Sequence, residues 1–251
     1  RILLEKHLPM PYGHHSIYSE KQLIINVIEL WLSRKNARKI VVKLNHGVSG
    51  DGNAILERDI TYDEFCALSA ENKFVYVRLR LKKLKFFLAT LNYGEFIKRV
   101  VMEGAIVEEF VDGQVKHSPS VQVMVNYNDK VEIISSHEQV FDHGGMRFLG
   151  SKFPARQVYR KEIEDLGLKA GERLLKSRIY GIFSIDFLIV ENGDDVKISL
   201  IEINIRKGGT THPYWTSKFL LDGSRCEKTG KLLDKDGEEF VYISNDNFER
   251  L

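Results

Sequence analysis

The stretch KLNHGVSGDGNA, residues 43–54, follows the apolar run Ile40–Val42 and places three glycines within six residues. Glycine loses more conformational entropy on folding than any other residue, so this cluster indicates a positive φ or a close approach of the backbone to another group. A lysine at the end of a strand, followed by backbone N–H groups that fold over phosphate oxygens, makes a nucleotide clamp. A glycine hairpin beside a surface lysine explains the same residues equally well, so this loop alone leaves both interpretations open.

The two common phosphate-binding fingerprints do not fit this loop. A P-loop needs GxxxxGK[ST], and Gly47–Gly52 has that spacing, but Asn53 and Ala54 stand where Lys and Ser or Thr belong. A GxGxxG pattern that begins at Gly50 meets Ile55 at its third glycine. The lysine therefore precedes the glycines, which distinguishes the loop from both fingerprints.

The composition is that of an ordinary globular protein. With 251 residues, of which 43% are apolar, the chain is long enough for one large domain or two small ones. No stretch approaches the roughly 18 apolar residues of a membrane span, and the opening RILLEKHLPMPYG lacks the apolar core of a signal peptide. Cys66 and Cys226 fit no metal or redox spacing, so we expect buried or free thiols in a reducing, cytoplasmic compartment. Because the sequence begins at Arg1, we expect it to be part of a longer protein.

The charge distribution excludes few classes of binding partner. The formal net charge is +2, and the densest basic run, Arg78–Lys85, alternates cations with leucines. This alternation predicts a solvated amphipathic segment, and because no aromatic residues for base stacking are interleaved, it disfavours nucleic-acid binding.

Apolar periodicity predicts helices and strands in an α+β order. Helical spacing is seen at residues 21–33 and in a helix that carries Ile163 and ends near residue 178, and the mixed pattern of residues 62–87 is interpreted as helical. Strand patterns are seen at 40–42, at 105–111, 121–125 and 131–134 as an antiparallel meander, and at 182–190 and 196–203 as a hairpin. Without an internal repeat, this order predicts one α+β unit in two lobes, residues 1–104 and 105–251.

The last hairpin carries acidic residues in apolar strands. Asp186 lies in SIDFLIV, and Glu202 lies in LIEIN two residues before Asn204, on the same face of the strand. Burying an unpaired acid costs several kcal/mol, so a cation is expected nearby, and three oxygen-bearing groups without cysteine or histidine suit Mg²⁺. Ion pairs with nearby Lys or Arg are the alternative.

The register of this hairpin tests the metal hypothesis. Asp186 and Glu202 share a face only if the sum of paired residue numbers is even, which requires a loop with an odd number of residues or a bulge. A simple two-residue turn at Asn192–Gly193 would point Asp186 away from Glu202.

A cationic, glycine- and threonine-containing loop follows the hairpin. Arg206 and Lys207 adjoin the proposed metal face, where a fixed guanidinium suits a phosphate or a carboxylate. The next residues, with their hydroxyls, suit the edge of a substrate: Gly208, Gly209, Thr210, Thr211 and His212. Beside the acids, this loop is the expected position of a transferring phosphoryl group.

Four motifs together resemble a known superfamily. VVKLNHGVSGDGNA, SPSVQV, SIDF and EINIRKGGTTHP, with the strand of Ile106–Val111, are similar to ATP-grasp domains. More narrowly, they resemble the pheganomycin-type peptide ligases and the ATP-grasp-like C-terminal region of IQ-motif-containing protein H. The resemblance runs from about Leu8 to Asp246. It implies an ATP-grasp fold, in which two α+β lobes hold a nucleotide between antiparallel sheets.

The resemblance also implies roles for residues of the first lobe. Lys43 would contact the α- and β-phosphates of ATP. The flap that covers them would be made of Gly50, Asp51, Gly52 and Asn53. The hinge strand that binds adenine would be made of Glu108, Glu109, Phe110 and Val111, with Glu109 or Asp112 near the ribose.

In the second lobe, the resemblance implies that Asp186, Glu202 and Asn204 hold Mg²⁺. It implies that Arg206 steadies the γ-phosphate and the acyl phosphate made from it, and that Lys207 is a second catalytic residue. The implied reaction activates a carboxylate as an acyl phosphate, which an amine attacks to form an amide or peptide bond. The domain that usually precedes an ATP-grasp fold is not within this sequence.

Some alternatives stay open. The domain is either such a ligase or an ATP-grasp-like module of a larger eukaryotic protein, in a cilium or sperm flagellum, that binds nucleotide or protein partners without turnover. Gln122, His137 and Gln139 lie in the matching segments and receive no role, and a hydrogen-bonded structural histidine is the favoured reading of His137.

Overall fold

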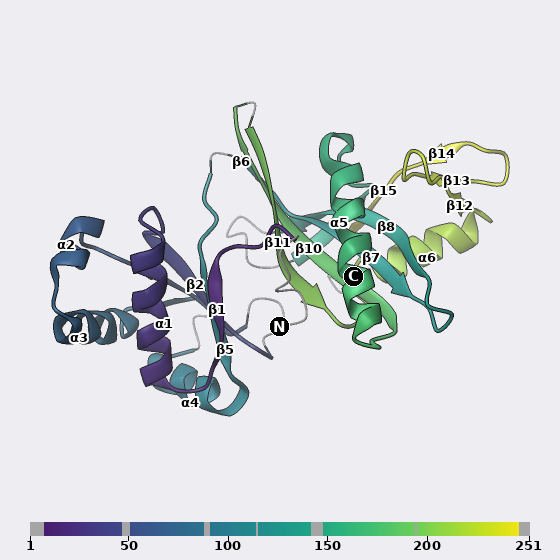
Figure 1. Cartoon of the computed structure of the whole chain (residues 1–251). Coiled ribbons are helices and arrows are strands. Elements are labelled where there is room, and N and C mark those ends of the chain that lie inside the picture. Colours follow the sequence, from purple (N-terminus) through teal and green to yellow (C-terminus); the bar gives the residue numbers. More distant parts are fainter. Residues whose placement is uncertain are drawn as a thin grey trace, which may run out of the picture. The chain divides into compact units, whose positions relative to one another are not determined.

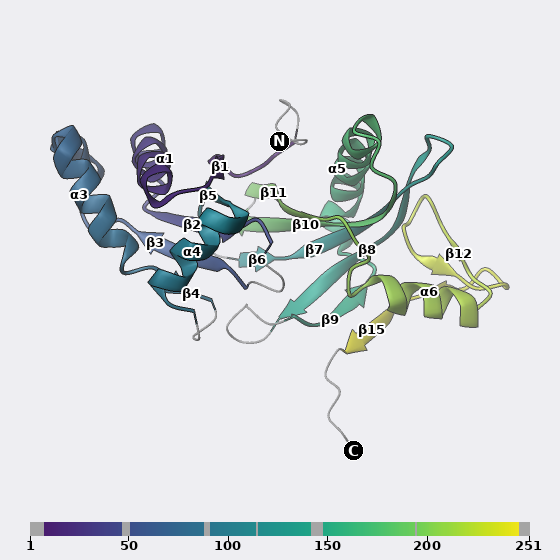
Figure 2. The same ribbon diagram turned by 90° about the horizontal axis from the view of Figure 1, so that it is seen from below.

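The computed structural model describes residues 8–46, 51–87, 91–113, 115–141, 148–193 and 195–245. The chain divides into two compact units, one made of Pro11–Val111 and the other of Asp112–Leu251 with Arg1–Met10. Each unit has an antiparallel sheet and a buried core of its own. Figures 1 and 2 label their elements in two views. The chain is therefore an α+β protein, as the sequence predicted.

The first unit is built on a five-stranded antiparallel sheet with the order β1-β5-β2-β3-β4. Its strands are β1 (Gly13–Ile17), β2 (Lys39–Leu44), β3 (Asn53–Glu57), β4 (Lys85–Phe86) and β5 (Ala105–Glu109). Its helices are α1 (Glu20–Ser33), α2 (Tyr62–Ala67), α3 (Ala70–Leu81) and α4 (Tyr93–Glu103).

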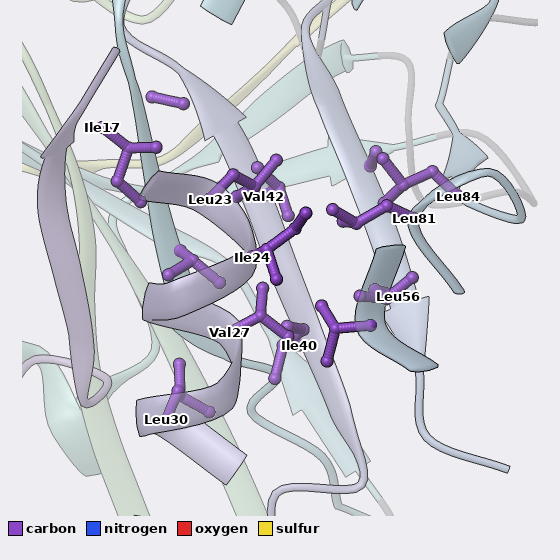
Figure 3. Close-up of a cluster of buried hydrophobic side chains, with 14 of the residues drawn as sticks. Ile17, Leu23, Ile24, Val27, Leu30, Ile40, Val42, Leu56, Leu81 and Leu84 are labelled. Atoms are coloured by element: carbon purple, nitrogen blue, oxygen red, sulfur yellow. The ribbon is translucent and has the colours of Figure 1, made fainter. Parts of the chain in front are cut away.

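Helix α1 forms where the helical spacing predicted it. Ser19 caps its first turn by accepting a hydrogen bond from the backbone N–H of Gln22, which satisfies one of the unpaired amides of a helix start. Its apolar face is fully buried, and Figure 3 shows Ile24 and Val27 pointing toward Ile40 of β2. Burial of each such side chain contributes about 1.5–3 kcal/mol.

The helical segment expected over residues 62–87 is two helices and a short strand. Thr61 and Ser69 each cap a helix with their hydroxyl groups, which interrupts the segment between α2 and α3. In the basic run, Leu81 and Leu84 are buried, and Arg80 forms an ion pair with Asp59 at 2.7 Å. The run is amphipathic, as the sequence predicted.

The second unit is built on a seven-stranded antiparallel sheet with the order β11-β10-β7-β8-β9-β15, in which β6 also pairs with β10. Its strands are β6 (Val115–His117), β7 (Pro119–Val125), β8 (Val131–Phe141), β9 (Phe148–Phe153), β10 (Gly181–Asn192), β11 (Asp195–Asn204) and β15 (Tyr242–Asn245). A small sheet adds β12 (Ser224–Arg225), β13 (Leu232–Leu233) and β14 (Glu239–Phe240), and the helices are α5 (Gln157–Lys176) and α6 (Thr211–Leu220).

Helix α5 covers one face of the seven-stranded sheet, across β7 and β8 (Figure 1). It is the helix that the sequence predicted around Ile163, and its apolar side chains Ile163, Leu166, Ala170 and Leu174 are buried. Gly171 allows a close approach, because a Cβ there would lie 2.5 Å from a methyl group of Val131. No helix in the described ranges is long and apolar enough to cross a membrane.

The expected meander over residues 105–137 is only partly correct. Strands β7 and β8 pair as predicted, whereas β5 lies in the other sheet, between β1 and β2. The division between the two units therefore falls at Val111/Asp112, seven residues after the boundary expected at 104/105. An alternating pattern identifies a strand but not its partner, because pairing depends on residues distant in the sequence.

The register of the last hairpin meets the condition for a shared face. Asn192 pairs with Asp195 at its tip, a two-residue turn that would by itself separate the acids. Phe187 pairs with Leu200 whereas Asp186 pairs with Glu202, so Ile201 is an extra residue in β11. This β-bulge restores the even register and places both acids on one face.

Candidate functional site

Asp186 and Glu202 lie directly opposite each other on β10 and β11. Asn204, next on the same face, donates from Nδ2 to Oδ2 of Asp186 at 2.9 Å. The structure therefore brings together the three groups that the sequence proposed as metal ligands.

The carboxylate of Asp186 is held by neutral donors. Its Oδ1 accepts hydrogen bonds from Nε2 of Gln139 at 3.0 Å and from Oγ of Ser184 at 3.2 Å, and Ser184 in turn contacts Ser120 at 2.8 Å. Burial raises the pKa of the Asp186 carboxyl to about 6, and the charge of Glu202 acts in the same direction. The hydrogen bonds lower this pKa in part. A bound cation would favour the ionised form that burial disfavours.

Glu202 differs from its neighbour because its side chain is exposed. Water can solvate its charge, so the argument that an acid in this strand must meet a cation holds for Asp186 and is wrong for Glu202. Within the described residues, neither acid forms an ion pair with Lys or Arg. The alternative of structural ion pairs is therefore absent from the described part of the chain.

The donor set fits a hard cation that keeps part of its water. The described residues hold no group of three or more His, Cys, Asp and Glu side chains that would form a metal cage. Asp186, Glu202 and Asn204 offer two carboxylates and one amide. Mg²⁺ is usually bound through one or two carboxylates together with water and phosphate oxygens, so these residues fit Mg²⁺.

Arg206 lies next to this cluster. Its guanidinium donates to Oδ1 of Asn204 at 3.3 Å and to the backbone carbonyl of Lys207 at 3.2 Å. The side chains of Arg206 and Lys207 are both exposed. Arg206 therefore lies beside Asn204, which is itself hydrogen-bonded to Asp186, and among the described residues it forms no ion pair with either acid.

The expected substrate loop is partly used by the protein itself. Thr210 and Thr211 are 3% and 2% exposed, whereas Gly209 and His212 are exposed. The hydroxyl of Thr211 accepts from the N–H of Gly208 at 3.1 Å and donates to Oε1 of Gln122 at 2.6 Å. The Thr211 hydroxyl thus has two partners within the protein.

In the first unit, Lys43 forms an ion pair with Glu108 across β2 and β5, with Nζ and Oε2 2.7 Å apart. Both side chains are largely buried, so the pair is better shielded from water than a surface ion pair. A phosphate beside Lys43 would share this lysine with Glu108.

The glycine-rich loop is described from Asp51 onward, and Gly50 lies outside the described residues, as do residues 47–49. Gly52 has φ +88°, and a Cβ there would lie 2.9 Å from the side chain of Leu44. Asp51 forms an ion pair with Arg99 at 3.0 Å. Asn53 lies opposite Lys43 in the backbone register of β2 and β3. At Gly52 the sequence is glycine because both the backbone angle and the close approach exclude a side chain.

The residues expected at the hinge contact other residues of their own unit. Oε1 of Glu109 accepts from the N–H of Tyr12 at 3.1 Å, and its Oε2 lies 3.9 Å from Arg34. The N–H of Phe110 donates to the carbonyl of Lys39. In the second unit, Oδ1 of Asp112 accepts from Lys116 at 3.0 Å. The carboxylates of Glu109 and Asp112 therefore already have partners. Val111, the last residue of the first unit, is partly buried.

Sequence reasoning gave no role to Gln139, Ser184 and Ser120, which surround Asp186. The alternation Ser-Val-Gln-Val over residues 120–123 was the available signal, since it gives β7 one polar face. His137 is fully buried, and its Nε2 contacts the hydroxyl of Tyr242 at 2.8 Å. Burial lowers the pKa of His137 to about 3, which fits the structural reading of this residue.

Comparison with known proteins identifies the fold. Residues 91–208 match the sequence model of the IQCH-like ATP-grasp family. The biotin carboxylase domain of the Hydrogenobacter thermophilus 2-oxoglutarate carboxylase, solved with MgADP, has a TM-score of 0.55 at 15% identity, covering 94% of this chain and 46% of that chain. N5-carboxyaminoimidazole synthetase from Staphylococcus aureus, solved with ADP, has a TM-score of 0.53 at 14% identity, covering 82% and 42%. The chain therefore has the ATP-grasp fold.

A curated relative narrows the resemblance. The L-propargylglycine–L-glutamate ligase of Streptantibioticus cattleyicolor is 28% identical over 246 residues, which cover 96% of this chain and 46% of that protein. The chain thus spans less than half of the length of this relative. The two sequence matches confirm the similarity to peptide ligases and to the IQCH-like ATP-grasp region that the motifs indicated.

Proposed function

We propose that this chain is an ATP- and Mg²⁺-dependent carboxylate–amine ligase domain. The observation that carries the proposal is the pairing of Asp186 with Glu202, with Asn204 and Arg206 beside them, in an ATP-grasp fold. The similarity to a ligase that joins two amino acids supports the same class of reaction.

The proposed reaction has two steps. An oxygen of the substrate carboxylate attacks the γ-phosphorus of ATP, and the bond from that phosphorus to the oxygen of ADP breaks. The nitrogen of the amine then attacks the acyl carbon, phosphate leaves with its bonding electron pair, and the amine loses a proton. The chain needs no nucleophile of its own, because catalysis consists of positioning and charge stabilisation.

The described residues have distinct roles in this proposal. Asp186, Glu202 and Asn204 would hold Mg²⁺, which neutralises charge on the phosphates when it is bound. Lys43 contacts the α- and β-phosphates, exchanging part of its interaction with Glu108 for them. Arg206 stabilises the charge that develops on the γ-phosphoryl group.

A second candidate is a nucleotide-binding module of a larger protein, without ligase turnover. The match of residues 91–208 to the IQCH-like ATP-grasp family favours it, together with the motifs that resemble the ATP-grasp-like C-terminal region of IQ-motif-containing protein H. In this reading the same acids and lysine bind nucleotide, and the partner is a protein.

Calorimetry of ATP binding in the presence of Mg²⁺ tests the nucleotide site. We expect binding by the wild type and its loss in the double variant Asp186→Asn, Glu202→Gln. The matched control Glu162→Gln, Glu172→Gln alters two exposed acids on α5 and should bind as the wild type does. Equal binding by all three proteins, or no binding by a folded wild type, would refute the proposed site.

Product analysis separates the two candidates. The ligase forms ADP only when a carboxylate and an amine are both present, so a panel of amino acids and short peptides should contain a pair that raises ADP formation. Binding of ATP without any such stimulation would favour the module.

A further inference from the structure

The loop that follows β11, residues 205–210, is fastened to the middle of the seven-stranded sheet. Its anchor is Gln122 of β7, which is fully buried and accepts a hydrogen bond from Thr211 at 2.6 Å. Thr211 also accepts from the N–H of Gly208 at 3.1 Å. The buried hydroxyl of Thr211 therefore links Gln122 of the central strand β7 to Gly208 in the loop.

The loop backbone lies directly on the sheet at Gly208. A Cβ at this position would be 3.0 Å from Oγ of Ser184 and 3.2 Å from Nε2 of Gln122. Ser184 also contacts Oδ1 of Asp186 at 3.2 Å. The anchor and the acid are thus neighbours in one contact network.

Arg206 lies between two fixed points of this loop. On one side, Asn204 ends β11 and is bonded to both Asp186 and Arg206. On the other side, Gly208 is held by Thr211. The exposed guanidinium of Arg206 has few contacts of its own in the described chain, so its position depends on the backbone on either side.

We propose that Gln122 is a positioning residue, which acts through Thr211 to set the place of Arg206 beside Asp186. The effect on nucleotide rests on the proposed function, whereas the fastening of the loop does not. Removing the Thr211 hydroxyl leaves Oε1 of the fully buried Gln122 and the N–H of the partly buried Gly208 without their hydrogen bonds. An unsatisfied buried group costs about 1–3 kcal/mol, and the loop can avoid that cost only by moving.

A double-mutant cycle tests the role. Affinity for the imido analogue of ATP with Mg²⁺ is measured by calorimetry in the wild type, Thr211→Val, Arg206→Ala and the double variant. We expect Thr211→Val to weaken binding about tenfold and to add less than about twofold in the Arg206→Ala background, because it acts through that arginine. Thr211→Ser, which keeps the hydroxyl, should bind within about twofold of the wild type.

The alternative outcomes are distinct. Equal effects of Thr211→Val in both backgrounds, or equal affinities of the Val and Ser variants, would overturn the proposal. Thr211 is used because Gln122→Leu would alter a fully buried position of a central strand and could change the fold itself.

Hydrogen exchange of the Gly208 amide gives a reading that does not depend on nucleotide. Exchange should rise about tenfold or more in Thr211→Val and stay near the wild-type rate in Thr211→Ser. If the wild type binds no nucleotide, the proposed function fails, and an unchanged exchange rate in Thr211→Val then overturns the fastening as well.

Discussion

The two faces of the seven-stranded sheet differ in composition although the same strands form both. On one face, Ile185 of β10 and Val121 of β7 lie opposite each other and pack with Ile163 of α5 in one buried cluster. On the other face, the residues opposite one another along one row are polar: Glu202, Asp186, Ser120 and His137. The adjacent row, Asn204, Ser184, Gln122 and Ser135, is polar as well.

This difference separates stability from proposed function. The apolar face contributes to the stability of the fold through burial, which does not depend on the orientation of individual groups. The polar face fixes the positions of side chains, because directional hydrogen bonds hold Asp186 and Gln122 in place. Substitutions on the two faces should therefore change different measurable quantities.

The largest expected effect is on the apolar face. Ile163→Ala should lower the free energy of unfolding by about 2–5 kcal/mol, since it removes a fully buried side chain and leaves a cavity. Urea unfolding measures the change. The neighbouring exposed variant Glu162→Ala should stay within about 0.5 kcal/mol of the wild type. Similar losses in the two variants would contradict the assignment of this helix face.

The next effect is a pH dependence that comes from the polar face. Because burial lowers the pKa of His137, the unfolded chain binds a proton at a higher pH than the folded chain does. The contribution of neutral His137 to the free energy of unfolding is present above the unfolded pKa of about 6.5 and is lost as the pH falls toward 3. When urea unfolding is measured at several pH values, the free energy of unfolding should fall more steeply with decreasing pH for the wild type than for His137→Gln.

An exposed histidine provides the control for that measurement. His15→Gln should keep the acid slope of the wild type, because His15 is exposed. Parallel slopes for the wild type and His137→Gln would mean that His137 is not held neutral in the folded protein.

Among these variants, Gln139→Leu is expected to change the free energy of unfolding least. It should nevertheless clearly weaken the binding of ATP. Gln139→Leu removes a hydrogen bond to Asp186, so affinity for ATP with Mg²⁺ should fall about tenfold or more. The unfolding free energy should change by about 1 kcal/mol or less. Calorimetry and urea unfolding on one preparation compare the two quantities, with the exposed variant Gln157→Leu as the control. A loss of stability without a loss of affinity would place Gln139 with the structural residues.

Much of the fold was predictable because local patterns decide it. The apolar spacing from Leu23 to Trp31 predicted α1, and the two runs around Asp186 and Glu202 predicted the last hairpin. Strand β5 was assigned to the wrong sheet, since its alternation specifies no partner. The burial expected of Glu202 was also wrong, because the exposure of an edge-strand residue is decided by what covers it.

The sequence by itself determined the residue types and their spacing: a lysine before the glycines, an acid in each strand of the hairpin, and a cationic loop after it. It also determined the requirement that an extra residue bring Asp186 and Glu202 to one face. Only the tertiary structure decided that the bulge falls at Ile201, that Gln139 supports Asp186, and that Thr211 is fastened to Gln122. These contacts join residues 47 and 89 positions apart, and pairing over such distances is set by the packing of the whole sheet and not by local preference.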